Sequence, residues 1–372
     1  MSASNISTSA IRIFGAPLRY LQGPGALEQI GQEAKLLGTR PLLVADEFVR
    51  QLIESDLKTS FQAEGMQLHS LAFNGEVTAN EVARLSGLAA PLSVDVVIAA
   101  GGGKGIDIGK AVARSLSCPV ITVPTAASND APTSKIFVLY DENHRLASVE
   151  HLAHNPSSVI VDTLLISKAP LSLLRAGIGD ALSKKFEVER CAAAGGKNIY
   201  GGLGTHAASS LADFTYRQLR THAEPALAAA ESGRHDEHVE ALVEATVLLS
   251  GLCFENGGLS ISHALTRGLS AIPGTSVALH GLQVAYGLLV QWVLEGRPQN
   301  EFDELLGFYE RVGLPRNLRE LGLREVATRE LLLTAAELTM SAPHTRNFPY
   351  ALTSHDIASA MAKVEGMSLF SD

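Results

Sequence analysis

The stretch from residue 95 to residue 116 restricts the possible folds of this chain more than any other. A short apolar run, DVVIAA (Asp95–Ala100), leads directly into three consecutive glycines and then into a helical pattern over Ile106–Leu116. Two further runs of this kind, Pro41–Asp46 and Pro119–Val123, are separated from it by helix-length segments. Continuous apolar runs are typical of strands that are buried on both faces of a parallel sheet. We therefore predict an α/β fold with a mostly parallel sheet for the first part of the chain.

The pattern changes after Asp162. From Leu164 onward, apolar residues recur at helical spacing, as in Ala241–Phe254 and Val284–Leu294, and strand-like runs disappear. A chain of 372 residues is long for one hydrophobic core. We predict an α/β domain over residues 1–162 and an all-α domain over residues 163–372.

Composition excludes several classes of partner. The formal net charge is -9 and the basic residues are scattered, whereas binding to a nucleic-acid backbone requires a basic stripe. The three cysteines lie far apart without a CxxC motif, which fits a reducing compartment. The N-terminus, MSASNISTSA, lacks the pattern of a signal peptide, and the apolar stretches are too short to span a bilayer. We expect a cytoplasmic protein that binds neither nucleic acid nor membrane.

The glycine run is a candidate phosphate site. Gly101, Gly102, Gly103 and Lys104 follow a predicted strand and precede a predicted helix. Glycines allow close approach of a ligand to the backbone, and a helix N-terminus offers free N–H groups to an anion. The spacing matches neither GxGxxG nor a Walker A loop, so a tight strand-to-helix turn remains an alternative.

Polar residues at the predicted strand ends are candidates for the same site. Thr122, Thr125 and Ser128 lie in TVPTAASNDAPTS, after the third apolar run, where hydroxyls can line a nucleotide site or simply form a capped loop. Asp46 ends PLLVAD, where it can accept hydrogen bonds from a ribose diol or cap the next helix.

Three further residues form a candidate metal site. Asp180 lies in AGIGDALSKKFE, after two glycines and near a predicted helix start, while His263 and His280 lie in FENGGLSISHAL and VALHGLQVAYG. Two imidazoles and a carboxylate bind Zn²⁺ or Fe²⁺ and leave coordination positions open. No short ligand spacing links the three residues, and a histidine on an apolar helix is more often a core or cap residue, so this alternative stays open.

The combination of motifs resembles a known family. GGGKGIDIGKA, VPTAASNDAPTS, AGIGDALSKKFE, GLCFENGGLSISHAL and HGLQVAYG occur in an order that is similar to the glycerol dehydrogenases of the iron-containing alcohol dehydrogenase superfamily. The resemblance extends from RYLQGPGAL to HTRNFPYALT, nearly the whole chain. It implies a Rossmann-like domain followed by a helical domain, as in the dehydroquinate synthase architecture. It also implies reversible hydride transfer between NAD and a vicinal diol or polyol such as glycerol, which becomes the hydroxyketone dihydroxyacetone.

The resemblance implies roles for individual residues. Asp180, His263 and His280 match the ligands of one divalent metal, with Zn²⁺ favoured over Fe²⁺. Asp130 matches an acid that binds a substrate hydroxyl. Positions that match the dinucleotide site are Asp46, Gly101, Gly102, Gly103, Lys104, Thr122, Thr125, Ser128, Ser134, Ile136 and Tyr140. The family also often forms homo-oligomers, which we expect here.

The departures from the family pattern concern the substrate. Asn129 replaces a usual Thr, and Lys184 and Lys185 stand where glycerol dehydrogenases tend to have Thr and Trp. Lys184 lies four residues after Asp180 on a predicted helix, so that both share a face. We expect it either to bind an anionic group of the substrate, as a catalytic-site residue, or to pair with Glu187 or reach solvent.

These departures leave two alternative functions open. The same fold acts on a 2-hydroxy acid or a phosphorylated polyol, to which a lysine would bind. A dehydroquinate-synthase-like lyase or cyclase belongs to a different class, but such enzymes usually have Glu as the first metal ligand, so Asp180 and the NDAP segment argue against it.

Overall fold

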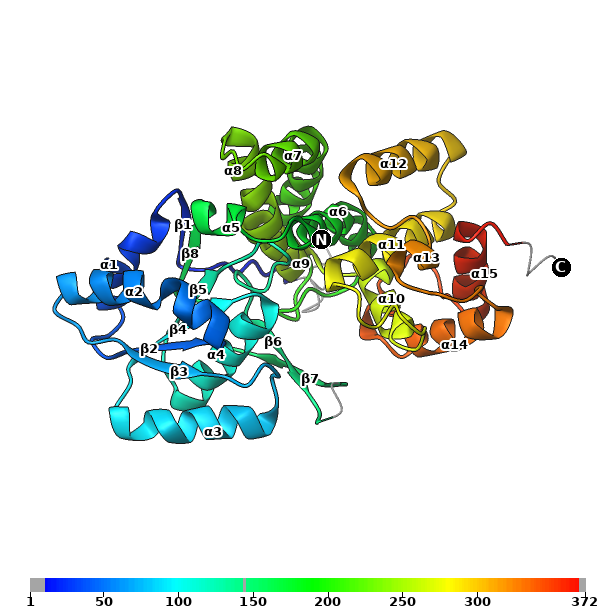
Figure 1. Ribbon diagram of the computed structural model, residues 1–372. Helices are drawn as coiled ribbons and strands as arrows, with labels where there is room; N and C mark the ends of the chain where they lie inside the picture. The colour runs from blue at the N-terminus through cyan, green and yellow to red at the C-terminus, as the bar shows by residue number, and fades with distance from the viewer. Residues whose placement is uncertain (1–10, 143–144, 368–372) are drawn as a thin grey trace, which may run out of the picture. The chain divides into compact units, whose positions relative to one another are not determined.

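The computed structural model describes residues 11–142 and 145–367 and divides into two compact units (Figure 1). Among the described residues, the sheet unit comprises those of Ala16–Leu171 and Ala229–Gly251, and the helical unit comprises residues 11–15, Ser172–Ala228 and residues 252–367. The boundary that we predict after residue 162 stays a prediction. The N-terminal MSASNISTSA segment, in which we expect no signal peptide, lies outside the described residues.

The sheet unit is built on a six-stranded sheet with the strand order β1-β8-β5-β4-β2-β3, in which every pairing is parallel. This confirms the predicted parallel sheet. Its strands are β1 (Arg19–Gly23), β2 (Pro41–Ala45), β3 (His69–Ala72), β4 (Val96–Gly101), β5 (Val120–Pro124) and β8 (Ser158–Asp162).

Alternate residues of the central strands enter two separate cores. Leu43, Ile98 and Ile121 pack with α1 (Ile30–Lys35) and α2 (Glu47–Ala63) on one face. Leu42, Val97 and Val120 pack with α3 (Ala79–Ala89) and α4 (Gly103–Leu116) on the other. Because successive strand residues point to opposite faces, a strand between two cores has to be apolar throughout. This explains the continuous apolar runs of the sequence.

The remaining elements of the sheet unit are short. The antiparallel pair β6 (Ile136–Tyr140) and β7 (Leu146–His151) forms a separate two-stranded sheet. Two helices, α5 (Thr163–Ser167) and α8 (Glu237–Val243), contact each other, and a π-helical segment over Glu244–Leu249 follows α8.

The helical unit packs α10 (Ile261–Leu269), α11 (His280–Leu294), α14 (Arg329–Met340) and α15 (Ser354–Val364) around one apolar core. Its other helices are α6 (Leu171–Ala193), α7 (His206–Glu231), α9 (Ser250–Gly257), α12 (Gln299–Val312) and α13 (Leu318–Leu321). The prediction of a helical second half is confirmed. Within the described part of the chain, no helix has both the length and the apolar character needed to cross a membrane.

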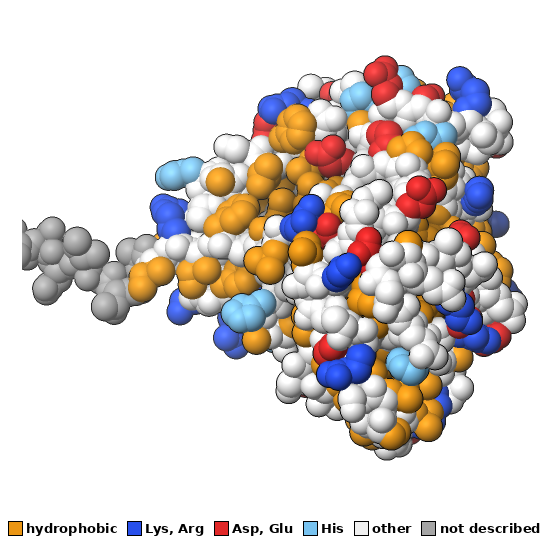
Figure 2. All heavy atoms as spheres, turned by 90° about the vertical axis from the view of Figure 1, so that its left-hand side faces the viewer, with side chains coloured by type: hydrophobic (Ala, Val, Ile, Leu, Met, Phe, Trp, Pro, Cys, Tyr) orange, Lys and Arg blue, Asp and Glu red, His pale blue; other side chains and the backbone are white. Residues whose placement is uncertain are grey.

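On the face shown in Figure 2, Lys and Arg side chains are interspersed with Asp and Glu side chains. No continuous basic stripe crosses that face.

Candidate metal centre and dinucleotide site

Asp180 lies in the middle of α6, so its predicted position near a helix start is wrong. The preceding glycines do not end the helix, and one of them, Gly179, allows α11 to approach it. A Cβ atom on Gly179 would lie 2.4 Å from the carbonyl oxygen of Gly281, and a Cβ atom on Gly281 would lie 1.8 Å from that of Ala176. Only glycine fits at both positions, and this close contact brings Asp180 next to the first residue of α11, which is His280.

Three helices of the helical unit bring the candidate ligands together. Asp180 on α6, His263 on α10 and His280 on α11 each offer one ligand atom, and these atoms all lie within 4.8 Å of one another. Asp180 is buried, whereas His280 is exposed. The group is therefore accessible from one side, which suits a site that takes up both an ion and a small molecule.

One oxygen of Asp180 has the properties of a metal ligand. Oδ1 accepts a hydrogen bond from Lys184 Nζ at 2.7 Å and lies 3.1 Å from His263 Nε2. Oδ2 is buried and has no hydrogen-bond partner among the described residues. A buried carboxylate oxygen without a partner is unfavourable unless a cation or water binds to it. The donor set of two imidazoles and one carboxylate therefore fits Zn²⁺ or Fe²⁺.

Glu187, which we did not predict, orients His263. Its Oε2 accepts a hydrogen bond from His263 Nδ1 at 2.6 Å, and its Oε1 accepts from the backbone N–H groups of Ser260 and His263 at 2.9 and 3.0 Å. Ser183 Oγ donates to Oε2 at 2.9 Å. A carboxylate that accepts Nδ1–H leaves Nε2 as the nitrogen for a metal, and such partners fix both the tautomer and the direction of the ring.

The charges of this group stabilise one another. Burial alone would raise the pKa of Asp180, but the Lys184 ammonium and His263 hold it far below its usual range. Burial would also raise the pKa of Glu187, yet His263 and Lys184 lower it to about 2. Burial would lower the pKa of His263, whereas Glu187 and Asp180 raise it to about 9. Both carboxylates are thus ionised at neutral pH and attract cations.

Lys184 lies inside this group and does not reach solvent, since only 1% of its side chain is exposed. Besides its bond to Asp180, its ammonium lies 3.1 Å from His263 Nε2 and 5.5 Å from the ring centre of Phe254. His344, a second residue that we did not predict, lies close enough to His263 for their charges to interact, and burial lowers its pKa to about 4. It is therefore a neutral ring at physiological pH.

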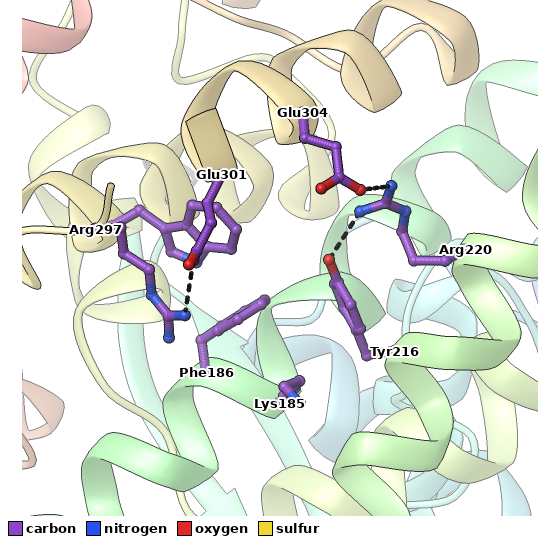
Figure 3. Close-up of a pocket in the computed structure, with 8 residues that line it drawn as sticks. Lys185, Phe186, Tyr216, Arg220, Arg297, Glu301 and Glu304 are labelled. Atoms are coloured by element: carbon purple, nitrogen blue, oxygen red, sulfur yellow. Dashed lines mark hydrogen bonds and ion pairs between the residues drawn. The ribbon is translucent and has the colours of Figure 1, made fainter. Parts of the chain in front are cut away.

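Lys185 lines a cavity that is separate from the metal-ligand group. Figure 3 shows it among residues from α6, α7, α11, α12 and the loop between α11 and α12, which line this cavity of about 490 Å³. The two guanidinium groups there, Arg220 and Arg297, lie over aromatic rings and pair with Glu304 and Glu301. Lys185 itself pairs with Asp213. The adjacent lysines of the sequence motif therefore have separate surroundings, and only Lys184 contacts the metal-ligand group.

In the sheet unit, the glycine run forms the turn between β4 and α4. Gly102 is the N-cap of α4, and within the described residues no side chain accepts a hydrogen bond from its first turn. Gly101 has a φ of 137°, a conformation that side chains rarely adopt. The free N–H groups and the helix dipole suit a pyrophosphate. Lys104 is half-exposed and pairs with Glu76 at 2.9 Å.

The other strand-end residues lie along the same edge of the sheet. Asp46 follows β2, which is the neighbour of β4, and its Oδ1 caps α2 by accepting from Val49 N at 2.8 Å. Thr125 follows β5, the neighbour on the other side, and its N–H donates to Gly101 O at 3.1 Å. Because the carboxyl ends of parallel strands meet at one edge, these residues surround the glycine turn.

The remaining candidates belong to the segment that follows β5. The hydroxyl of Thr122 is fully buried and donates to Pro132 O at 2.8 Å, so it supports the backbone of this segment. Asp130 Oδ2 accepts from Ser250 Oγ at 3.0 Å. Ser128 and Ser134 are buried, while Ile136 and Tyr140 are half-buried on β6.

Comparisons with known proteins agree with these features. A family described as iron-containing alcohol dehydrogenase matches residues 17–163. A glycolaldehyde reductase from Halobacterium salinarum is 38% identical over 95% of this chain and 97% of its own length. A glycerol dehydrogenase from Thermotoga maritima is 38% identical over 93% of this chain and 94% of its own. The crystal structure of glycerol dehydrogenase from Schizosaccharomyces pombe matches with a TM-score of 0.92 at 35% identity, covering 96% of this chain and 91% of that chain. The similarity includes residues of both units, and it confirms the predicted resemblance and fold.

Proposed function

Because this chain belongs to the iron-containing alcohol dehydrogenase family and is an NAD-dependent alcohol dehydrogenase, we propose that it oxidises a vicinal diol or polyol to the hydroxyketone. Glycerol is the representative substrate, as in the relatives named glycerol dehydrogenase. The observation that carries the proposal is the group of Asp180, His263 and His280, whose ligand atoms lie within 4.8 Å of one another.

These three residues would hold one divalent ion, for which we propose Zn²⁺. The partnerless Oδ2 of Asp180 and the exposed side of the group support an ion that is reached by substrate. Such an ion, when bound, acidifies a hydroxyl and polarises a carbonyl. Glu187 accepts the Nδ1–H of His263 and so would leave Nε2 available to the ion.

The sheet unit would bind NAD, which accepts the hydride. The N–H groups at the start of α4 would bind the pyrophosphate of NAD, and Asp46 would accept hydrogen bonds from the adenosine ribose. Asp130, which Ser250 holds by a hydrogen bond, would accept one from a second substrate hydroxyl and so favour diols over simple alcohols. Thr122, Thr125, Ser128, Ser134, Ile136 and Tyr140 would line or support the dinucleotide.

The role of Lys184 decides the class of substrate. Its ammonium is buried and lies next to two of the proposed ligands, so it can give a charged hydrogen bond to an anionic group that approaches the ion. This supports the alternative substrates, a 2-hydroxy acid or a phosphorylated polyol. A charged hydrogen bond of this kind is worth roughly 1.5–3 kcal/mol, or about one to two decades in specificity.

A substrate panel tests both the proposed diol oxidation and the proposed role of Lys184. NADH absorbance is followed with glycerol, a 2-hydroxy acid and a phosphorylated polyol, and in reverse with glycolaldehyde, for the wild type and Lys184→Thr loaded with Zn²⁺. Diol oxidation by the wild type is expected, and its absence for every substrate would refute the proposed function. If Lys184→Thr changes no ratio of kcat/KM between neutral and anionic substrates, then Lys184 does not select the substrate.

We further propose a cytoplasmic homo-oligomer. The wide spacing of the three cysteines, none of which forms a disulfide in the described residues, supports a reducing compartment, and the oligomeric state is taken from the family resemblance. Light scattering measured during size-exclusion chromatography determines the oligomeric state.

A further inference from the structure

Within the described residues, two lysines are completely buried, and the proposed function uses only one of them. Lys184 belongs to the metal-ligand group, whereas Lys110 lies on α4 in the sheet unit, two turns after the glycine run. Burying an ammonium is unfavourable unless its N–H groups all have acceptors. The partners of Lys110 therefore indicate what the residue does.

Lys110 binds both ends of one segment, residues 131–136. Its Nζ donates to Ala131 O at 2.5 Å and to Ile136 O at 2.7 Å, and it lies 3.4 Å from Ser134 Oγ. An ammonium has three donors, and these three acceptors belong to the same segment. Lys110 thus fixes the distance between the start and the end of the segment.

Two other side chains, the buried Thr122 and the partly buried Asn155, hold the backbone between these two ends. Thr122 Oγ1 donates to Pro132 O at 2.8 Å, and Asn155 Nδ2 donates to Thr133 O at 3.1 Å. The segment is irregular, and two of its carbonyl groups accept backbone hydrogen bonds: Ala131 O from Ser134 N at 3.3 Å and Lys135 O from Leu152 N at 2.8 Å. Side chains from outside supply the other donors, and Lys110 is the charged one among these three.

Asp107 completes the arrangement from the same helix. Its Oδ2 accepts from Val138 N at 3.1 Å, just beyond the segment. It is buried one turn before Lys110, and the two charges attract each other. Asp107 and Lys110 together attach α4, which starts at the glycine run, to the chain from residue 131 to residue 138.

The segment lies between residues with proposed roles. Asp130 directly precedes it, and Ser134 and Ile136 belong to it. We propose that Lys110 is a positioning residue, which holds residues 131–136 in the shape that places Asp130 and Ser134 for substrate and dinucleotide without touching either ligand. This inference rests on the proposed function, because it concerns the same site.

The test measures NADH binding without substrate, so that it is separate from turnover. Lys110→Met keeps the length of the side chain and removes its donors. We expect the Kd for NADH, measured by fluorescence, to rise about tenfold to a hundredfold, as for the loss of a charged anchor. Hydrogen exchange should accelerate in peptides that cover residues 129–140, and Zn²⁺ binding in the helical unit should be unchanged. Lys168→Met, on an exposed lysine of the same unit, is the matched control and should bind NADH like the wild type.

The outcomes distinguish this inference from the proposed function. If the wild type binds no NADH, the proposed function fails. If the wild type binds it and folded Lys110→Met has the same Kd and the same local exchange, the positioning role is overturned. Should Lys110→Met fail to fold, Lys110→Arg carries the test, because it keeps a charged donor of different shape. Weaker NADH binding with faster exchange at residues 129–140 supports the role, and wild-type values of both overturn it.

Discussion

Replacing Glu187 with Gln tests how the metal-ligand group is oriented. The carboxylate accepts four hydrogen bonds: from Ser183 Oγ, from the backbone N–H groups of Ser260 and His263, and from His263 Nδ1. Glutamine has nearly the same shape, but one of its oxygens becomes an NH₂ group. If its oxygen stays on the two backbone N–H groups, the NH₂ group faces His263 Nδ1. Two donors then meet at 2.6 Å.

The imidazole relieves this conflict by losing the Nδ1 proton. Nδ1 becomes the acceptor, and the remaining proton lies on Nε2, which is the nitrogen that would bind the metal. To bind a metal, Nε2 must give up its proton, and the neutral ring then carries its proton on Nδ1. The Nδ1–H group again faces the NH₂ group of the glutamine, so two donors are in contact. Loss of such a partner typically lowers metal affinity by 10–100-fold, which corresponds to about 1.4–2.8 kcal/mol. We expect Glu187→Gln to lie at the upper end, since Glu187 is fully buried and water cannot replace it.

The assay is a competition titration of Zn²⁺ against a chromophoric chelator, with folding checked by circular dichroism. Glu189→Gln is the matched control, because Glu189 lies on the same helix with a half-exposed side chain near Lys185. Its Zn²⁺ affinity should equal that of the wild type. A folded Glu187→Gln protein with wild-type Zn²⁺ affinity would show that Glu187 does not control the tautomer of His263.

Three further predictions concern other parts of the site. His263→Ala should lower metal affinity by about an order of magnitude or more while the fold survives, and unchanged metal occupancy in elemental analysis would contradict the ligand assignment. Asp46→Gly should reduce the preference for NAD over NADP. The loss of stability should be small, because glycine is tolerated at an N-cap. If the wild type uses NAD and NADP equally, Asp46 does not select the cofactor. Burial raises the pKa of Asp107 from 3.8 to about 7, so the folded state binds a proton that the unfolded state releases, and this group lowers the unfolding free energy as pH rises toward 7. Asp107→Asn has no group that titrates at this position. Its unfolding free energy from urea titrations, relative to that of the wild type, should therefore rise by about 2–3 kcal/mol between pH 5 and pH 8. A difference in unfolding free energy that does not change with pH would contradict the shifted pKa.

Three strands that are buried along their whole length were predicted from their sequence, whereas β8, which is equally buried, was not. The runs that became β2, β4 and β5 are buried along their whole length because each contacts two cores. The edge strands β1 and β3 are half-exposed and contain polar residues, so periodicity did not reveal them. Burial, rather than strand formation itself, produces the signal in the sequence.

The metal-ligand group was identified by resemblance, because its members are brought together only by folding. Asp180 and His263 are 83 residues apart, and no local spacing predicts their contact. Glu187 could have been found from the sequence, since Asp180, Lys184 and Glu187 follow at helical intervals and share one face. His344 carried no comparable signal. The ligand roles themselves stay predictions.

The contact between Gly179 and Gly281 has a consequence for the choice of ion. Asp180 and His280 are each bonded directly to one of these glycines in the chain, and the helices already touch backbone to backbone. Their side chains therefore start from points that cannot move closer together by repacking, and separating them would break the contact between the two helices. Larger ions such as Ca²⁺ require longer bonds and six to eight oxygen ligands, which this fixed frame does not provide. We therefore expect the site to prefer small ions over large ones. The preference would come from Gly179 and Gly281, whose lack of a Cβ atom lets the helices touch, although neither glycine contacts the ion.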